Sequence, residues 1–213
     1  MNLRESLNAI PTHWDGKDCI IEMKKGGSKQ WKQMEWIGFY TEFWASNNLN
    51  KVMKMPGKSY GRTKFDGFKE VSYGFKTHSM FDKNGRRQQD FIGNDLEATK
   101  NTINEYGYLV LVVLHGEVVF DLDRTFYEWH ENIKGGKSKY TEEREARGAP
   151  SRMRKSGFNV KKISLYKINK ETLNRTSTFQ EGMRNSNGNL RRVKVKYSEE
   201  ILKDCVVEEI EFA

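Results

Sequence analysis

An acidic residue and a lysine lie close together in the segment 64–78, KFDGFKEVSYGFKTH. The segment predicts two short strands joined by a tight connection, with Asp66 and Gly67 on the first strand and Lys76 near the end of the second. A carboxylate on one strand can hold a divalent metal ion, while a lysine on the next positions or deprotonates water or neutralises charge on phosphorus. The pattern therefore indicates phosphodiester cleavage, although an ordinary exposed hairpin can carry the same two residues.

Alternation along the second strand decides which side chains share a face with the lysine. It is imperfect, and it puts Val71, Tyr73 and Phe75 on one side and Ser72, Gly74 and Lys76 on the other.

This hairpin resembles the catalytic core of the PD-(D/E)xK nucleases, and within them of type II restriction endonucleases. Their core has an Asp on one strand and then Asp or Glu, any residue, and Lys on the next. Phe65-Asp66-Gly67 resembles the first element, and Gly74-Phe75-Lys76 stands where the second belongs.

The resemblance implies a sequence-specific, Mg²⁺-dependent double-stranded DNA endonuclease of a restriction-modification system. It implies Asp66 and the main-chain carbonyl of Phe75 as metal ligands, and Asp66 and Lys76 as catalytic residues. It also implies a homodimer, because palindromic duplex sites match two-fold protein symmetry.

One position departs from the pattern, since residue 74 is glycine where an acid is expected. A metal site without that carboxylate loses charge and one or two oxygen ligands. Three explanations are open. Another acid substitutes, with Glu70 or a helix glutamate nearest; the chain is a non-cleaving relative; or the glycine is an inactivating substitution, which we favour at this stage.

Residues 29–44 predict a helix, because apolar side chains recur at near-helical spacing in Trp31, Met34, Ile37 and Tyr40. Glu35 and Glu42 share a face of this helix, and buried carboxylates need a partner. They either pair with surface Lys or Arg, or one of them reaches the metal site. Glu35, flanked by Met34 and Trp36, is the preferred third catalytic candidate.

A second E-x-K motif, Glu22-Met23-Lys24, follows Asp15 and Asp18. The segment 18–24 predicts a strand, but the interval from Asp18 to Glu22 is too short to leave one strand and return on another. A solvated edge strand explains these residues better than a catalytic site does.

The remaining pattern predicts a central mixed β-sheet flanked by helices, of the α/β (α+β) class with a restriction-endonuclease-like core. Asn94 or Asp95 is expected to cap a helix that ends near Glu105. Tyr108–Leu114 predicts a central strand covered on both faces, and His115-Gly116 is expected to turn it into a partner strand.

The segment 134–162 carries ten lysines and arginines against three glutamates. It is either a solvated insertion or a DNA-contacting one, and the second is our prediction. Arginine can hydrogen-bond guanine edges bidentately, whereas lysine suits phosphate. The DNA-binding candidates are Arg147, Arg152 and Arg154 for bases and Lys134, Lys137, Lys139 and Lys155 for phosphates.

Composition bounds the class of protein. With 213 residues the chain is expected to form one domain, 1–213, and its 12% aromatic content argues against disorder. No stretch is long and apolar enough for a membrane span, the N-terminal residues do not resemble a signal peptide, and Cys19 and Cys205 lack metal spacing. We therefore expect a cytoplasmic protein with free thiols.

Three functions remain to be compared. A net charge of +8 suits a polyanion partner. It fits the endonuclease, and it fits equally a non-cleaving nucleic-acid-binding module, which Gly74 favours. The third function, a small-molecule enzyme, has no support, because the sequence contains no glycine-rich phosphate loop, nucleophile elbow or zinc motif.

Overall fold

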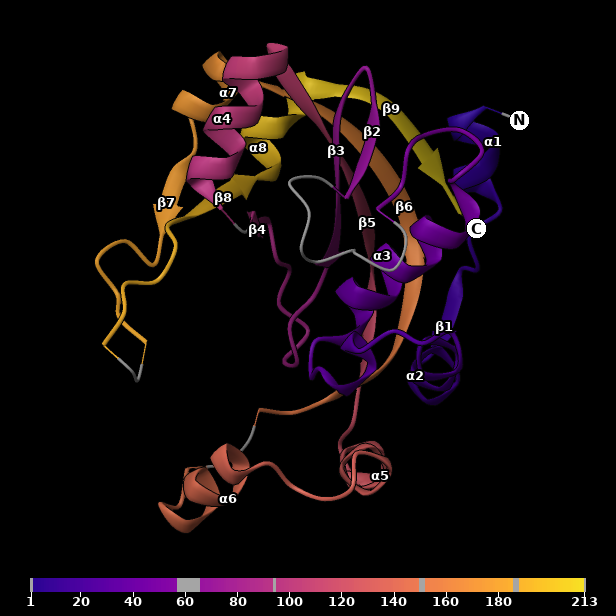
Figure 1. Cartoon of the computed structure of the whole chain (residues 1–213), viewed down its shortest axis with the longest axis vertical. Helices are drawn as coiled ribbons and strands as arrows, with labels where there is room; N and C mark the ends of the chain where they lie inside the picture. The colour runs from indigo at the N-terminus through magenta and orange to yellow at the C-terminus, as the bar shows by residue number, and fades with distance from the viewer. Residues whose placement is uncertain (1, 57–65, 94, 150–151, 186–187, 213) are drawn as a thin grey trace.

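The computed structural model describes residues 2–56, 66–93, 95–149, 152–185 and 188–212. Its central sheet contains β1 (His13–Asp15), β2 (Gly67–Lys69), β3 (Val71–Ser79), β5 (Tyr108–Phe120), β6 (Lys155–Asn169) and β9 (Val206–Glu211). The strand order is β1-β6-β5-β3-β2, and β9 also pairs with β6 (Figure 1). Strands β3 and β5 are parallel and the other pairs are antiparallel, so the sheet is mixed.

A smaller antiparallel sheet lies beside the central one. It contains β4 (Asp90–Gly93), β7 (Ser177–Phe179) and β8 (Lys194–Ser198), in the order β4-β8-β7. Figure 1 shows it at the left of the central sheet.

Helices cover both faces of the central sheet. They are α1 (Leu3–Asn8), α2 (Gly16–Lys25), α3 (Trp36–Asn48), α4 (Leu96–Tyr106), α5 (Thr125–Ile133), α6 (Lys139–Ala146), α7 (Lys170–Asn174) and α8 (Glu199–Leu202). No helix in the described ranges is both long and apolar enough to span a bilayer.

Alternation along β5 divides the buried side chains into two cores. Val112 and Leu114 pack with α1, α2, α3 and α5, whereas Leu111 and Val113 pack with α4, α7, α8 and the smaller sheet. The predicted central mixed sheet flanked by helices is confirmed, and both of its faces are buried because these elements cover them, as is usual around a parallel strand pair.

Several local predictions are also confirmed. β2 and β3 form a hairpin whose turn holds Glu70 at φ 62°. The Asp95 side chain accepts a hydrogen bond from the Ala98 N–H and caps α4, whereas Asn94 lies outside the described residues. Both cysteines are free thiols.

The predicted strand 18–24 is wrong, because these residues belong to α2. The Asp15 carboxylate accepts from the Lys17 and Asp18 N–H groups and caps that helix. Cys19, Ile20 and Met23 then form its buried face. The second E-x-K motif is therefore helical, and its Glu22 accepts a hydrogen bond from the Tyr40 hydroxyl.

The predicted helix 29–44 begins later than expected. Residues Gln30–Lys32 form only a 3₁₀ turn, with the Ser28 hydroxyl accepting from the Gln30 N–H. Gln33 is extended, and α3 starts at Trp36. The Trp36 indole N–H donates to the Lys155 carbonyl, which fixes the start of the helix against β6.

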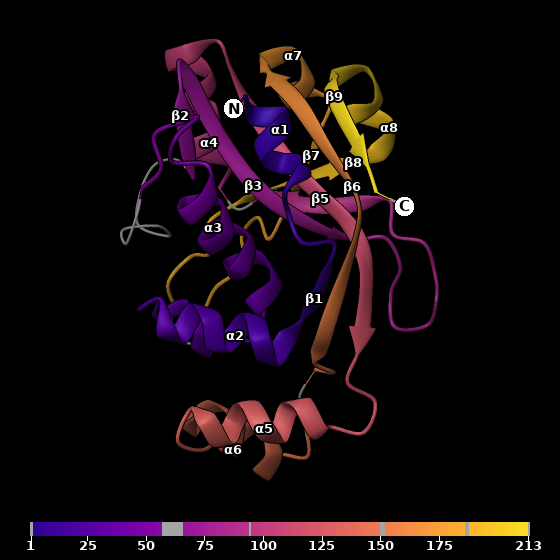
Figure 2. The ribbon, with the colours of Figure 1, turned by 90° about the vertical axis from the view of Figure 1, so that its right-hand side faces the viewer.

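The predicted turn at His115-Gly116 is also wrong, because β5 continues through it to Phe120. The register against β6 shifts there, so Lys161 is an extra residue in β6. The long curved strands are clear in Figure 2. Gly116 permits the bend, because a Cβ on it would lie 2.3 Å from the Asn159 carbonyl oxygen.

Gly116→Ala should therefore destabilise the fold by about 2 kcal/mol or more, through overpacking against backbone. Gly38→Ala in α3 is the matched control, since its Cβ would meet only the Thr77 hydroxyl at 3.9 Å. That change should stabilise by about 0.5–1 kcal/mol. Urea unfolding measures both, and equal stability of the two variants would contradict the bulge assignment.

Candidate active site

Asp66 and β3 are joined directly. The Asp66 N–H donates to the Tyr73 carbonyl, and the Asp66 carboxylate accepts from the Phe75 N–H at 2.9 Å. The Asp66 carboxylate thus takes the place of a main-chain carbonyl as the acceptor for β3, at the point where β2 begins. In an extended strand the N–H and C=O of one residue point to the same edge, so the Phe75 carbonyl faces the Asp66 side as well. Phe65 of the motif lies outside the described residues.

Asp66 and Lys76 line one pocket of about 330 Å³. Its walls come from α3, the β2–β3 hairpin, β4, α4 and β8. The lining residues that could act on a ligand are Glu42, Asp66, Ser72, Tyr73, Lys76, Asp95 and Arg192. The pocket is about ten times the volume of one water molecule, so it has room for an ion and a phosphate group.

Glu42 brings a second carboxylate to this pocket from the middle of α3. Burial, followed by the negative charge of Asp66, raises the pKa of Glu42 to about 7, while Lys76 acts in the opposite direction. The Glu42 Oε2 atom is buried and has no hydrogen-bond partner among the described residues. A buried acceptor beside a second acid is costly unless a cation satisfies it.

Gly74 and Lys76 lie on the same face of β3. A Cβ at position 74 would lie 3.8 Å from Asp66 Oδ2 and 3.1 Å from Leu111 Cδ2. An acid introduced there would start beside Asp66, and the Leu111 methyl would have to move by a few tenths of an ångström. Because Gly74 has no side chain, the carboxylates at this part of the pocket come from Asp66 and Glu42.

The geometry favours Glu42 over the other glutamates that the sequence offered. Glu35 precedes α3, is 57% exposed and pairs with Lys155 at 3.0 Å. Glu70 is exposed in the hairpin turn. Neither lines the pocket. The sequence preference for Glu35 rested on its apolar neighbours, Met34 and Trp36, but α3 begins only at Trp36, so Glu35 lies outside the helix proper.

Most of the predicted DNA-binding residues already contact acidic groups of the chain. Lys134 pairs with Glu131, Lys137 with Glu145 and Lys155 with Glu35. Arg147 donates to the Glu143 carbonyl, and Arg147, Lys139 and Arg152 are exposed. These exposed residues stay predictions as DNA contacts.

Arg154 does not fit the predicted role of base reading. Its side chain is 7% exposed and pairs with the buried Glu131 at 3.0 Å. Its guanidinium also lies over the Tyr127 ring, 5.1 Å from the centroid. Arg154 therefore ties the end of β6 to α5 and is not free to reach a base.

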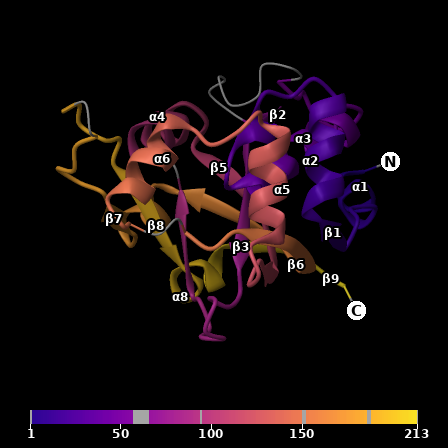
Figure 3. The same cartoon turned by 90° about the horizontal axis from the view of Figure 1, so that it is seen from below.

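The basic segment and the carboxylate pocket lie in different parts of the molecule. Lys134, Lys137, Arg144, Arg152 and Arg154 line a separate pocket with residues 32–34, and the two pockets share no lining residue. Seen from below, α6 lies on the side of the smaller sheet and α5 on the side of α2 and α3 (Figure 3).

The donor set of the carboxylate pocket fits a magnesium ion. Asp66, Glu42 and the Phe75 carbonyl would offer oxygen ligands only, which is the preference of Mg²⁺. The Glu42 oxygen has no hydrogen-bond partner among the described residues, and a cation beside it would stabilise the charged form that burial and Asp66 disfavour.

Comparison with protein-family models, curated proteins and solved structures found no match. The interpretation of the pocket therefore depends on its own geometry.

Glu42→Gln should change stability in a pH-dependent way. Because the native pKa lies above the ordinary value of 4.5, the charged carboxylate disfavours the native state. The penalty appears as pH rises from about 4.5 to 7 and is complete above that. We expect the variant to be more stable than the parent at pH 8, by on the order of 2 kcal/mol, and equally stable near pH 4. Unfolding in metal-free buffer with Glu35→Gln as control measures this; a constant difference at all pH values would contradict it.

Arg154→Ala should destabilise the chain by about 2–3 kcal/mol, because it removes one of the two cations that pair with the buried Glu131 and leaves only Lys134. Lys139→Ala, an exposed change in the same basic segment, should have an effect below about 0.5 kcal/mol. Thermal unfolding compares the two, and a stable, normally folded Arg154→Ala protein would return this arginine to the DNA-binding candidates.

Proposed function

We propose that the chain is a Mg²⁺-dependent phosphodiester hydrolase that cleaves double-stranded DNA, of the type II restriction kind. The observation that carries the proposal is the shared pocket of Asp66, Glu42 and Lys76, with a buried carboxylate oxygen that has no described partner. In this proposal Glu42 replaces the acid missing at position 74.

Asp66, Glu42 and the Phe75 carbonyl would hold the ion, which would supply Lewis-acid stabilisation of charge on the phosphate. The Phe75 N–H keeps the Asp66 carboxylate oriented before substrate arrives. Burial of the Glu42 Oε2 atom would strengthen its interaction with a cation in the pocket.

Lys76 acts on the reacting phosphate. Hydrolysis forms a bond from a water oxygen to phosphorus and breaks one P–O ester bond, and negative charge grows on the phosphate oxygens. An ammonium group in the same pocket offsets that charge and orients the water. A group with a pKa near 7, such as Glu42 in the absence of metal, can also exchange a proton at neutral pH.

The DNA backbone would be held by exposed cations, one that lines the pocket and others in the separate basic segment. Arg192 lines the pocket, is 82% exposed and touches Asp95 at 3.1 Å. Lys139 and Arg152 are exposed in the basic segment. Such contacts give steep salt dependence without sequence information. Sequence specificity, a homodimer and a cytoplasmic location belong to the proposal as well.

The second candidate function is a nucleic-acid-binding module that does not cleave. Gly74 favours it, since one carboxylate of the resembled motif is absent.

The cleavage experiment incubates the purified chain with supercoiled plasmid and MgCl₂. We expect discrete fragments from the parent protein and a fall in rate of about a hundredfold or more for Asp66→Asn, Glu42→Gln and Lys76→Ala. Glu35→Gln is the matched control on the same segment and should cleave like the parent.

Gly74→Glu separates the alternatives. Cleavage by Gly74→Glu alone would mean that the glycine inactivates the site and that Glu42 does not replace the acid. Tight binding with intact plasmid for both proteins would favour the binding module. Equal activity of Glu42→Gln and the parent would remove Glu42 from the site.

A further inference from the structure

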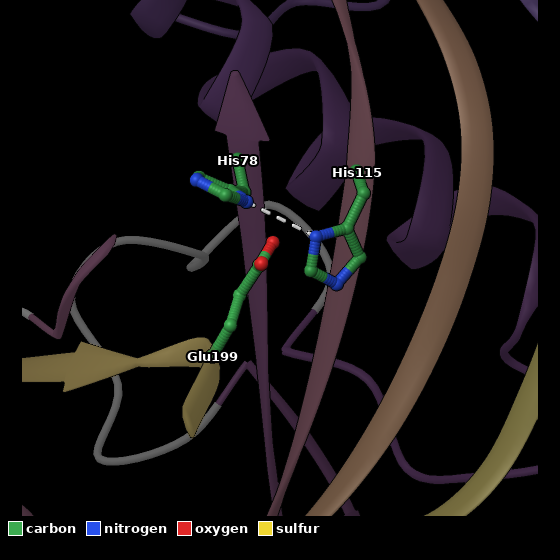
Figure 4. Close-up of side chains that lie close together, drawn as sticks. All are labelled: His78, His115 and Glu199. Carbon is green, nitrogen blue, oxygen red and sulfur yellow. Dashed lines mark hydrogen bonds between the residues drawn. The ribbon is translucent and has the colours of Figure 1, made fainter. Parts of the chain in front are cut away.

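Two histidines and a glutamate meet outside the carboxylate pocket. His78 of β3 and His115 of β5 are register partners in the parallel pair, and Glu199 is the first residue of α8. One ligand atom from each lies within 4.8 Å of the others. Figure 4 shows the carboxylate directed at the space between the two imidazoles. None of the three lines the carboxylate pocket.

From this arrangement we propose a second metal site, selective for Zn²⁺ or a similar transition-metal ion, with His78, His115 and Glu199 as ligands. Two nitrogens and a carboxylate oxygen suit zinc, cobalt or nickel, whereas magnesium prefers oxygen ligands only. The site is therefore distinct in chemistry from the one proposed beside Asp66.

The nitrogen positions agree with such an ion. The two Nδ1 atoms lie 3.1 Å apart. Two nitrogen ligands at ordinary zinc distances in a tetrahedral site are about 3.3 Å apart. The same separation suits an N–H···N hydrogen bond between the rings, which is the alternative that the experiment below tests.

A neighbouring hydroxyl can accept a hydrogen bond from the tautomer of His115 that a metal needs. The Tyr166 hydroxyl lies 3.2 Å from His115 Nε2. When it accepts a hydrogen bond from Nε2–H, the lone pair of His115 is left on Nδ1, which faces His78. Metal-bound histidines usually donate their second ring N–H to an oxygen in this way, most often of a carboxylate, a carbonyl or water.

Burial and access also suit a bound ion. His78 and His115 are 3% and 2% exposed, whereas the Glu199 side chain is 31% exposed and also touches Arg87 at 2.9 Å. A carboxylate has two oxygens and can serve both partners. An ion would enter from the Glu199 side, and its fourth position would take water.

The structural effect would be to join the two sheets. His78 and His115 belong to the central sheet, and Glu199 directly follows β8 of the smaller sheet. The Glu199 N–H already donates to the Gln89 carbonyl, just before β4. A metal ion would add a bond between layers that pack through apolar side chains such as Val113 of β5 and Val195 of β8.

The test uses the full chain, depleted of metal with a chelator and titrated with Co²⁺, which has visible absorption bands in a four-coordinate site. We expect one Co²⁺ per chain with those bands, displaced by Zn²⁺ but not by Mg²⁺. Affinity should fall by at least about tenfold in His115→Asn and Glu199→Gln, and by about tenfold in Tyr166→Phe. Zn²⁺ should raise the Tm of the parent but not of Glu199→Gln.

Two controls isolate the site. His130→Asn changes another buried histidine, which contacts the Trp31 carbonyl elsewhere in the molecule, and it should bind Co²⁺ like the parent. The double variant Asp66→Asn, Glu42→Gln removes the carboxylate pocket and should keep the bands. Loss of the bands in that double variant, or an undiminished Co²⁺ affinity in Glu199→Gln or in a folded His115→Asn protein, would overturn the proposal. Glu199→Gln keeps it testable if the histidine variants do not fold.

Discussion

The parallel pairing of β3 with β5 is the constraint on which the rest of the structure depends. The pairing fixes the register from Tyr73 to Ser79, at a place where both faces of the sheet are covered. Because side chains alternate along a strand, this register puts Gly74, Lys76 and His78 on one face and Phe75 on the other. A slip by one residue would exchange these sets and remove both chemical clusters at once.

The carboxylate pocket opposes the stability of the fold. Apolar packing of α3 on the sheet brings Glu42 below the surface, next to Asp66, where its charged form is disfavoured. Catalytic and binding sites commonly carry such unfavourable charge, which a ligand relieves. Glu35 carries no such unfavourable charge. Its ion pair with Lys155 is exposed, so it changes the free energy of unfolding very little.

The sequence predicted the parts of the fold that depend on local pattern. The apolar run of β5, the hairpin and the Asp95 cap follow from periodicity and side-chain type. The errors came from competing tertiary effects. Asp15 acts as a helix cap, which reassigns 18–24 to a helix, and Gly116 bends a strand and does not end it. The buried ion pair between Arg154 and Glu131 could not be predicted, because the two residues lie 23 positions apart in the sequence. Glu42 and Glu35 could not be separated before the start of α3 was known.

The main chain of β3 around Lys76 is held in place by the residues on either side of it. On one side the Phe75 N–H is bonded to Asp66 and its ring is buried, and on the other His78 is enclosed by His115 and Phe91. The backbone that carries the amine is therefore immobilised before any ligand arrives. Only the side-chain torsions remain to be ordered on binding, at a cost of about 2 kcal/mol or less. Folding itself thus completes most of the preorganisation that a charged group needs to meet a phosphate.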